Sequence, residues 1–200
     1  MISGHRVPVA LAVLPVAAIL LSGCAGDRAP VTASPARQPP QVDVAASPAC
    51  PDLPRADPRP DGLPDEPLAC LGAGPDVRLS DLRGTPMVLN VWAAWCTKCA
   101  AEMPVLRAMQ ERAGNRLRFF GVHYKAERDH GLQAAADFGV SFPSVHDEDG
   151  DLIAGSLQAF APPQTFFVTA DGRIAGRKIG EITSAEELAK LVEEHLGVRV

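Results

Sequence analysis

The chain has 200 residues, which is enough for one compact domain with accessory segments. Hydrophobic residues make up 46% of the chain, so a buried core can form. The formal net charge of −5, without any cluster of Lys and Arg, excludes the basic surface that nucleic-acid binding requires, and no nucleic-acid partner is expected.

The first 23 residues are predicted to be a signal peptide. Arg6 provides a positive start, and residues 7–21 are apolar over a length that suits a signal sequence and is short for a membrane span. The small residues before Cys24 resemble a bacterial lipobox, in which the cysteine is acylated and becomes the new N-terminus. We therefore expect a lipoprotein anchored through Cys24; the alternative is an ordinary signal peptide with an incidental cysteine.

Residues 24–49 are predicted to form a tether, because they are rich in Pro, Ala and Ser and contain few large apolar side chains. Residues 50–74 remain rich in proline but contain Cys50 and Cys70. We interpret this second segment as an irregular extension that a disulfide holds in place. A folded domain is expected over residues 75–200.

The chain contains five cysteines. If Cys24 carries lipid, four remain, and an even number of cysteines in an exported protein indicates disulfides. Cys96 and Cys99 are too close for a typical structural bridge and suit a redox-active pair. Cys50 and Cys70 then remain for a structural disulfide; the alternatives are that both are free thiols or that one exchanges with a partner.

Hydrophobic patterning after residue 75 predicts strands alternating with helices. Strands are expected at residues 77–79, 87–92, 117–123, 144–146, 165–169 and 173–179. Helices are expected at residues 96–112, 129–138, 152–157 and 184–196. Asp171 and Gly172 predict a hairpin turn, and Ser184 with Glu187 predicts a capping box. This order predicts an α/β fold with parallel central strand pairs and an antiparallel edge.

The motif Trp95-Cys96-Thr97-Lys98-Cys99 lies between an apolar strand and a helix, which places Cys96 at the helix N-terminus. Unpaired backbone N–H groups and the helix dipole stabilise a thiolate there, and Lys98 adds a nearby cation. Cys96 is therefore predicted to attack a substrate disulfide, and Cys99 to resolve the mixed disulfide. A zinc site would need two further ligands, and the spacing of the other cysteines resembles no zinc knuckle. No metal and no bound cofactor is expected.

Residues from about 70 to 198 resemble the thioredoxin fold, specifically its membrane-anchored TlpA/ResA-like branch. The resemblance rests on the motif at residues 88–99, on Glu-Met-Pro at 102–104 and on Pro-Gln-Thr-Phe-Phe-Val at 163–168. The stretch 121–150 looks like the extra strand-and-helix insertion of this branch, placed after the first active-site helix. The resemblance implies a central mixed sheet flanked by helices.

The same resemblance implies a substrate-binding surface beside the cysteines. Pro163 occupies the place of the family's cis-proline, which faces the nucleophile, and the backbone of Pro162 would pair with an extended substrate. Because Pro162 has no N–H, one of the usual substrate hydrogen bonds is missing. Trp95 is expected to line this surface.

An acidic residue near the resolving cysteine is a further feature of the branch, and Glu102 occupies its position. Helical spacing places Glu102 on the same face as Cys99, where it is expected to exchange a proton with that thiol. The alternative is a solvated helix glutamate. Asn90 stands where thioredoxin itself has a buried aspartate, and an amide cannot accept the proton.

The resemblance implies an extracytoplasmic enzyme, anchored to the cell membrane, that reduces disulfides of exported proteins such as apocytochrome c. Its electrons would come from a membrane thiol carrier. A non-catalytic lipoprotein that binds copper or a partner through the same cysteines is the alternative from another class. His123 or His146 would then supply a third copper ligand, although known copper proteins of this kind have a Cys-x-x-x-Cys pattern instead.

Overall fold

The computed structural model describes residues 43–159 and 161–200. The predicted signal peptide, Cys24 and residues 25–42 of the predicted tether lie outside the described residues. Within the part of the chain that the structure describes, no helix combines the length and the apolar character needed to cross a membrane.

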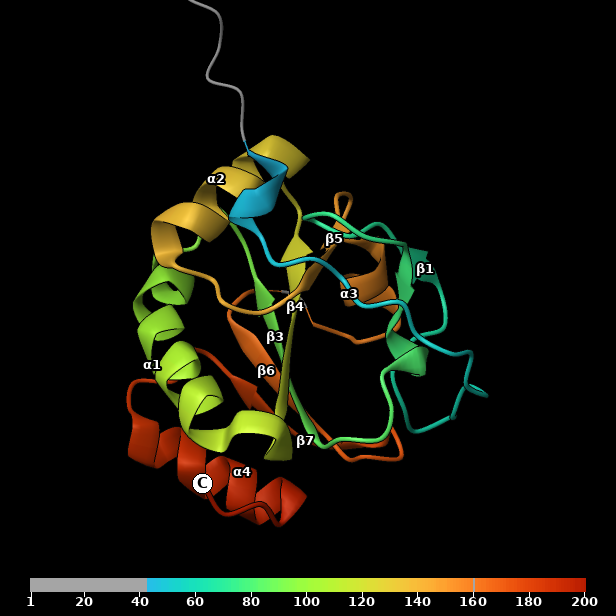
Figure 1. The fold of residues 1–200 in the computed structure, drawn as a ribbon, viewed down its shortest axis with the longest axis vertical. Helices are drawn as coiled ribbons and strands as arrows, with labels where there is room; N and C mark the ends of the chain where they lie inside the picture. The colour runs from blue at the N-terminus through green and yellow to red at the C-terminus, as the bar shows by residue number, and fades with distance from the viewer. Residues whose placement is uncertain (1–42, 160) are drawn as a thin grey trace, which may run out of the picture. The chain divides into compact units, whose positions relative to one another are not determined.

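A five-stranded mixed sheet forms the centre of the fold, in the order β5-β4-β3-β6-β7 (Figure 1). Its strands are β3 (Met87–Trp92), β4 (Arg118–Tyr124), β5 (Ser144–Asp147), β6 (Gln164–Val168) and β7 (Ile174–Ile179). Strands β3, β4 and β5 pair in parallel, whereas β6 runs antiparallel to both β3 and β7. The predicted α/β class with a mixed sheet is confirmed. The antiparallel pairing reaches the central strand β3, and is not confined to the edge.

Among the described residues, four α-helices and three 3-10 turns accompany the strands. They are η1 (Val44–Ala46), η2 (Leu79–Asp81), α1 (Thr97–Ala113), η3 (Gly114–Arg116), α2 (Arg128–Phe138), α3 (Asp151–Gly155) and α4 (Ala185–Leu196). Ser184 caps α4 by accepting the N–H of Glu187 at 3.1 Å. In a usual capping box the Glu187 carboxylate would accept the N–H of the N-cap residue Ser184. Here it accepts the N–H of Thr183, one residue earlier, at 2.9 Å.

Both faces of the sheet are covered. Helices α1, α2 and α4 lie on one side, and the N-terminal extension with α3 lies on the other (Figure 1). Alternate residues of β3 enter the two cores, with Val88 and Trp92 facing the helices and Leu89 and Val91 facing the extension. Burial on both faces explains why β3 appears in the sequence as an apolar run that only Asn90 interrupts.

The extension contains a short strand, β1 (Pro67–Leu68), which pairs antiparallel with β2 (Val77–Arg78). The strand predicted at residues 77–79 therefore exists only in part and lies outside the main sheet. Cys70 forms an isolated antiparallel bridge to Val145 of β5. This contact covers the outer edge of β5, which would otherwise expose unpaired backbone groups.

The ordered chain begins earlier than the sequence suggests. Residues 43–49 belong to the predicted tether, yet they contain η1, and Ser47 is buried. The N–H of Cys50 donates to the carbonyl of Ala73 at 2.9 Å, which holds the preceding residues against the folded part. A composition-based prediction does not detect this contact, because its partner lies more than 20 residues further along the chain.

Candidate active site

Cys96 and Cys99 are joined by a disulfide at the start of α1, with an S–S distance of 2.06 Å and a Cα–Cα distance of 5.2 Å. β3 ends at Trp92, and Cys96 is the N-cap residue of α1. The Sγ atom of Cys96 accepts the N–H of Cys99 at 3.0 Å, a donor that has no partner within the helix. In the reduced protein the same donor and the helix dipole favour a thiolate on Cys96.

The two sulfurs differ in access to solvent. Cys96 is 6% exposed, whereas Cys99 is completely buried. The neighbouring Trp95 is 57% exposed, and its Nε1–H donates to the carbonyl of Lys125 at 3.0 Å. Cys96 is therefore the sulfur that a substrate disulfide can reach first, and Cys99 is placed to act after it.

Glu102 lies on α1, one turn beyond Cys99, and its side chain is fully buried. Its Oε1 accepts from Nδ2 of Asn90 at 2.8 Å, and its Oε2 accepts from the N–H of Ile182 at 3.0 Å. Burial raises the pKa of Glu102 to about 7; these two hydrogen bonds oppose the rise, and the charge of Glu181 adds to it. The alternative of a solvated helix glutamate is wrong.

The peptide bond between Pro162 and Pro163 is cis. It directly precedes β6, whose first residue Gln164 pairs with Val91 near the end of β3. The antiparallel pairing thus brings the proline loop to the end of the sheet from which the Cys96 loop emerges. Pro163 is buried, and its carbonyl accepts the N–H of Gly180 at 3.0 Å, whereas Pro162 is half-buried and offers no N–H.

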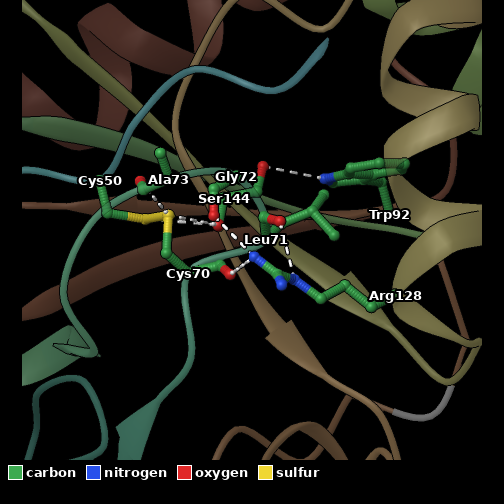
Figure 2. Close-up of a disulfide and its surroundings, with 8 residues drawn as sticks. All are labelled: Cys50, Cys70, Leu71, Gly72, Ala73, Trp92, Arg128 and Ser144. Atoms are coloured by element: carbon green, nitrogen blue, oxygen red, sulfur yellow. Dashed lines mark hydrogen bonds between the residues drawn. A yellow bond between two sulfur atoms is a disulfide. The ribbon is translucent and has the colours of Figure 1, made fainter. Parts of the chain in front are cut away.

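A second disulfide joins Cys50 to Cys70, with an S–S distance of 2.05 Å and a Cα–Cα distance of 5.9 Å (Figure 2). Both residues are buried. The N–H of Leu71 donates to the carbonyl of Ser144 at 2.8 Å, and Oγ of Ser144 accepts from Nε1 of Trp92 at 3.3 Å. Leu71, the residue after Cys70, is therefore linked through Ser144 of β5 to Trp92, the last residue of β3.

His123 and His146 are register partners on β4 and β5, and their Nδ1 atoms lie 3.0 Å apart. Burial lowers the pKa of His123 to about 3, so this imidazole is neutral. Among residues 43–159 and 161–200, no group of three or more His, Cys, Asp and Glu side chains could hold a metal ion. The sequence predicts that both histidines lie near strand ends but does not predict their contact, which depends on the pairing of β4 with β5.

A model of the AhpC/TSA family matches residues 63–177, which is more than half of the chain. The chain belongs to the AhpC/TSA family. A curated relative, thiol:disulfide interchange protein DsbE of Pseudomonas fluorescens biotype C, is 36% identical over 114 residues, which cover 55% of this chain and 62% of the relative. DsbE of Vibrio cholerae serotype O1 is 34% identical over 138 residues, covering 61% and 73%. The AhpC/TSA chain thus spans 62% of the length of the Pseudomonas relative.

Solved structures share the fold of this chain. A secreted Mycobacterium tuberculosis disulfide oxidoreductase superposes with a TM-score of 0.53 at 25% identity, covering 65% of this chain and 96% of that one. A thioredoxin family protein of Chlorobium tepidum, named a thiol:disulfide interchange protein, gives 0.56 at 22% identity, covering 71% and 100%. These matches confirm the predicted thioredoxin-like fold. Both curated relatives are named thiol:disulfide interchange proteins.

Proposed function

We propose that this AhpC/TSA chain is an extracytoplasmic thiol–disulfide oxidoreductase that reduces disulfides of exported proteins. The observation that carries the proposal is the placement of the cysteine pair: Cys96 caps α1 with its sulfur on the N–H of Cys99, and Cys99 is buried behind it. The names of the curated relatives, thiol:disulfide interchange proteins, support the same reaction.

The reaction proceeds by two exchanges that together move two electrons. The Cys96 thiolate attacks one sulfur of the substrate disulfide, which forms a mixed disulfide and releases the other substrate sulfur as a thiolate. The Cys99 sulfur then attacks Cys96, which restores the disulfide of the pair and releases the second substrate thiol. The substrate is reduced and the pair is oxidised.

The second exchange requires Cys99 to lose its proton in a site without water contact. Glu102 is the proposed acceptor, because it lies one turn along α1 and its pKa of about 7 allows it to take or give a proton near neutral pH. Asn90 orients this carboxyl group by its hydrogen bond to Oε1. Trp95, Pro162 and Pro163 are proposed to line the surface that receives the substrate chain.

We propose the reducing direction, and the charge near Cys99 supports it. A carboxylate at Glu102 repels a thiolate at Cys99, so the reduced pair gains less stability than the reduced pair of a strong oxidant. We expect a reduction potential nearer to the roughly −270 mV of thioredoxin than to the roughly −120 mV of a strong oxidant such as DsbA. A measured value near the oxidant would overturn the direction but not the exchange chemistry.

The cellular setting is proposed from the TlpA/ResA-like resemblance. Acylation of Cys24 would anchor the protein at the outer side of the cell membrane, with electrons from a membrane thiol carrier and apocytochrome c or a similar exported protein as substrate. Metabolic labelling with a fatty acid tests the anchor: we expect incorporation into the full-length chain and none into a Cys24→Ala variant. Equal labelling of both would exclude acylation at Cys24.

Trapping of the mixed disulfide tests the cysteine roles. A Cys99→Ser variant, reduced and mixed with an exported protein that contains one disulfide, is expected to accumulate a covalent adduct through Cys96. The matched Cys96→Ser variant should form far less, since its remaining sulfur is buried. No adduct with either variant would overturn the proposal, and tight stoichiometric Cu(I) binding without exchange would favour the copper-binding alternative.

A further inference from the structure

A cavity of about 350 Å³ opens beside Trp95, the residue before Cys96, between the loop that carries Trp95 and helix α2. Ala94 and Ala126 line it from the two loops, and Ala134 and Phe138 line it from α2. Exposed polar side chains of α2 complete the lining. The volume is at the lower end of the range, about 300–1,000 Å³, in which proteins bind small ligands.

The Trp95 wall of the cavity is fixed although it is poorly buried. The indole is 57% exposed, and its Nε1–H donates to the carbonyl of Lys125 at 3.0 Å. Lys125 has a φ of 49°, a left-handed conformation that non-glycine residues rarely adopt. Lys125 is itself exposed, so core packing does not explain this conformation; it directs a carbonyl towards the indole.

The α2 wall is fixed at both ends of the helix. Arg128, the first residue of α2, donates to the carbonyls of Leu71 and Gly72 at 3.0 and 2.8 Å, in the two residues that directly follow Cys70 of the Cys50–Cys70 disulfide (Figure 2). Phe138, the last residue, packs edge-on against Trp92 with ring centroids 6.3 Å apart. Two held walls make a preformed pocket, which lowers the cost of binding.

We infer that this cavity is a side-chain pocket of the exchange site and accepts one aromatic side chain of the substrate protein, within two residues of the attacked cysteine. The inference rests on the proposed function. Trp95, which lines the pocket, directly precedes Cys96 in the chain, so one wall of the pocket adjoins the attacking cysteine. A substrate residue one or two positions from its cysteine lies about 3.5–7 Å along an extended chain, which matches this proximity.

The lining favours an aromatic occupant over a charged one. Three alanines leave room, and the rings of Trp95 and Phe138 provide edge-to-face and stacking partners. Two further lining residues, His130 and Asp137, are both exposed and retain their water, so neither is a buried partner for a substrate charge. Aromatic burial therefore offers the larger gain.

A series of short peptides tests the inference. Each peptide carries one cysteine as its mixed disulfide with glutathione, and one phenylalanine at position −2, −1, +1 or +2 in an otherwise alanine sequence; the reference has alanine throughout. Reduced wild-type protein is expected to react once with at least one phenylalanine peptide with a second-order rate constant about 10-fold above that of the reference, which corresponds to ~1.4 kcal/mol. Equal values at all four positions would overturn the inference.

A matched pair of variants ties the preference to the cavity. Ala126→Leu fills the cavity, whereas Ala136→Leu makes the same change at an exposed α2 position outside its lining. We expect the ratio of phenylalanine to reference rates to fall towards one in Ala126→Leu and to persist in Ala136→Leu. An unchanged ratio in Ala126→Leu would overturn the site, and the wild-type series remains decisive if that variant does not fold.

Reaction with oxidised glutathione distinguishes failure of the exchange function from failure of the pocket. If the wild-type protein reduces neither oxidised glutathione nor any peptide, the proposed function fails. If it reduces oxidised glutathione and all peptides at equal rates, the exchange function stands and the pocket alone is rejected.

Discussion

Asn90 donates from one amide nitrogen to both Glu102 and Thr165, at 2.8 Å to Oε1 and 3.2 Å to Oγ1. One side chain of β3 thereby connects α1 and β6 beneath the cysteine pair. An aspartate at this position would set a second carboxyl group against Glu102, and like-charge repulsion would shift both titrations. With asparagine, Glu102 remains the single carboxyl group of this buried contact.

Replacement of Glu102 by Gln should change how stability depends on pH. The folded pKa of about 7 lies above the ordinary value of 4.5, so folding favours the protonated form. Wild-type stability is complete below about pH 4.5 and falls as the pH rises towards 7, by up to about 3 kcal/mol. Glu102→Gln lacks this loss. The difference between its free energy of unfolding and that of wild type, measured in urea, should therefore increase by that amount from pH 4.5 to pH 8.

The comparison with wild type also removes the contribution of His123. Burial lowers its pKa to about 3, so it destabilises the fold as the pH falls below its ordinary range, opposite in sign to Glu102. Both proteins contain His123, and the difference isolates Glu102. The free Oδ1 of Asn90 can accept from the new Gln amide, so the variant should keep its contact. Glu111→Gln, at an exposed position on α1, is the control and should show no such trend.

The same substitution should slow the resolving exchange. Without a carboxyl group near Cys99, its proton has no acceptor, and the single-turnover rate at pH 7 should drop by at least about 10-fold. In wild type the rate should rise with pH around 7, following deprotonation of Glu102. Rapid-quench measurement of mixed-disulfide decay reports this step. An unchanged rate and pH profile would remove Glu102 from the mechanism.

Loss of the second disulfide should lower global stability. The bond joins residues 20 apart in sequence, and restricting a loop of that size in the unfolded chain contributes about 3 kcal/mol. A Cys50→Ala, Cys70→Ala double variant should lose about this much in urea unfolding under oxidising conditions. The matched Cys96→Ala, Cys99→Ala variant removes a disulfide between residues only three apart in sequence. Its loss of stability should be clearly smaller. A loss under about 1 kcal/mol for the first variant would contradict a structural role.

Gly131 should tolerate no side chain. A Cβ atom there would lie 2.5 Å from the His123 ring, which is fully buried and packed against Trp92. Gly131→Ala should therefore destabilise the protein by about 1–3 kcal/mol, despite the better helix propensity of alanine. At Gly155 on α3 an added Cβ atom meets nothing within 4 Å, so Gly155→Ala should be neutral or slightly stabilising. Thermal unfolding of both variants measures the difference. Equal effects would show that His123 can move aside.

Local patterns in the sequence were sufficient for most of the architecture. The helix predicted at 96–112 is α1 (Thr97–Ala113), and the strand predicted at 87–92 is β3, because apolar spacing and capping residues act within a few positions. The position and role of the cysteine pair could also be predicted, since its chemistry depends on a two-residue gap at a helix start. The 3-10 turn within residues 43–49 is not predicted by local composition, because it depends on contacts with distant residues.

The amino-acid sequence by itself determined the order of the elements and placed the Cys96–Cys99 pair at the N-terminus of a helix. Only the tertiary structure decided that Glu102 is buried against Asn90, because that requires α1 to pack on β3. The pocket beside Trp95 was likewise invisible, since its walls come from segments more than 30 residues apart. Spacing along the chain specifies which groups are adjacent on one element, whereas burial and the pKa shift it causes arise only when elements pack.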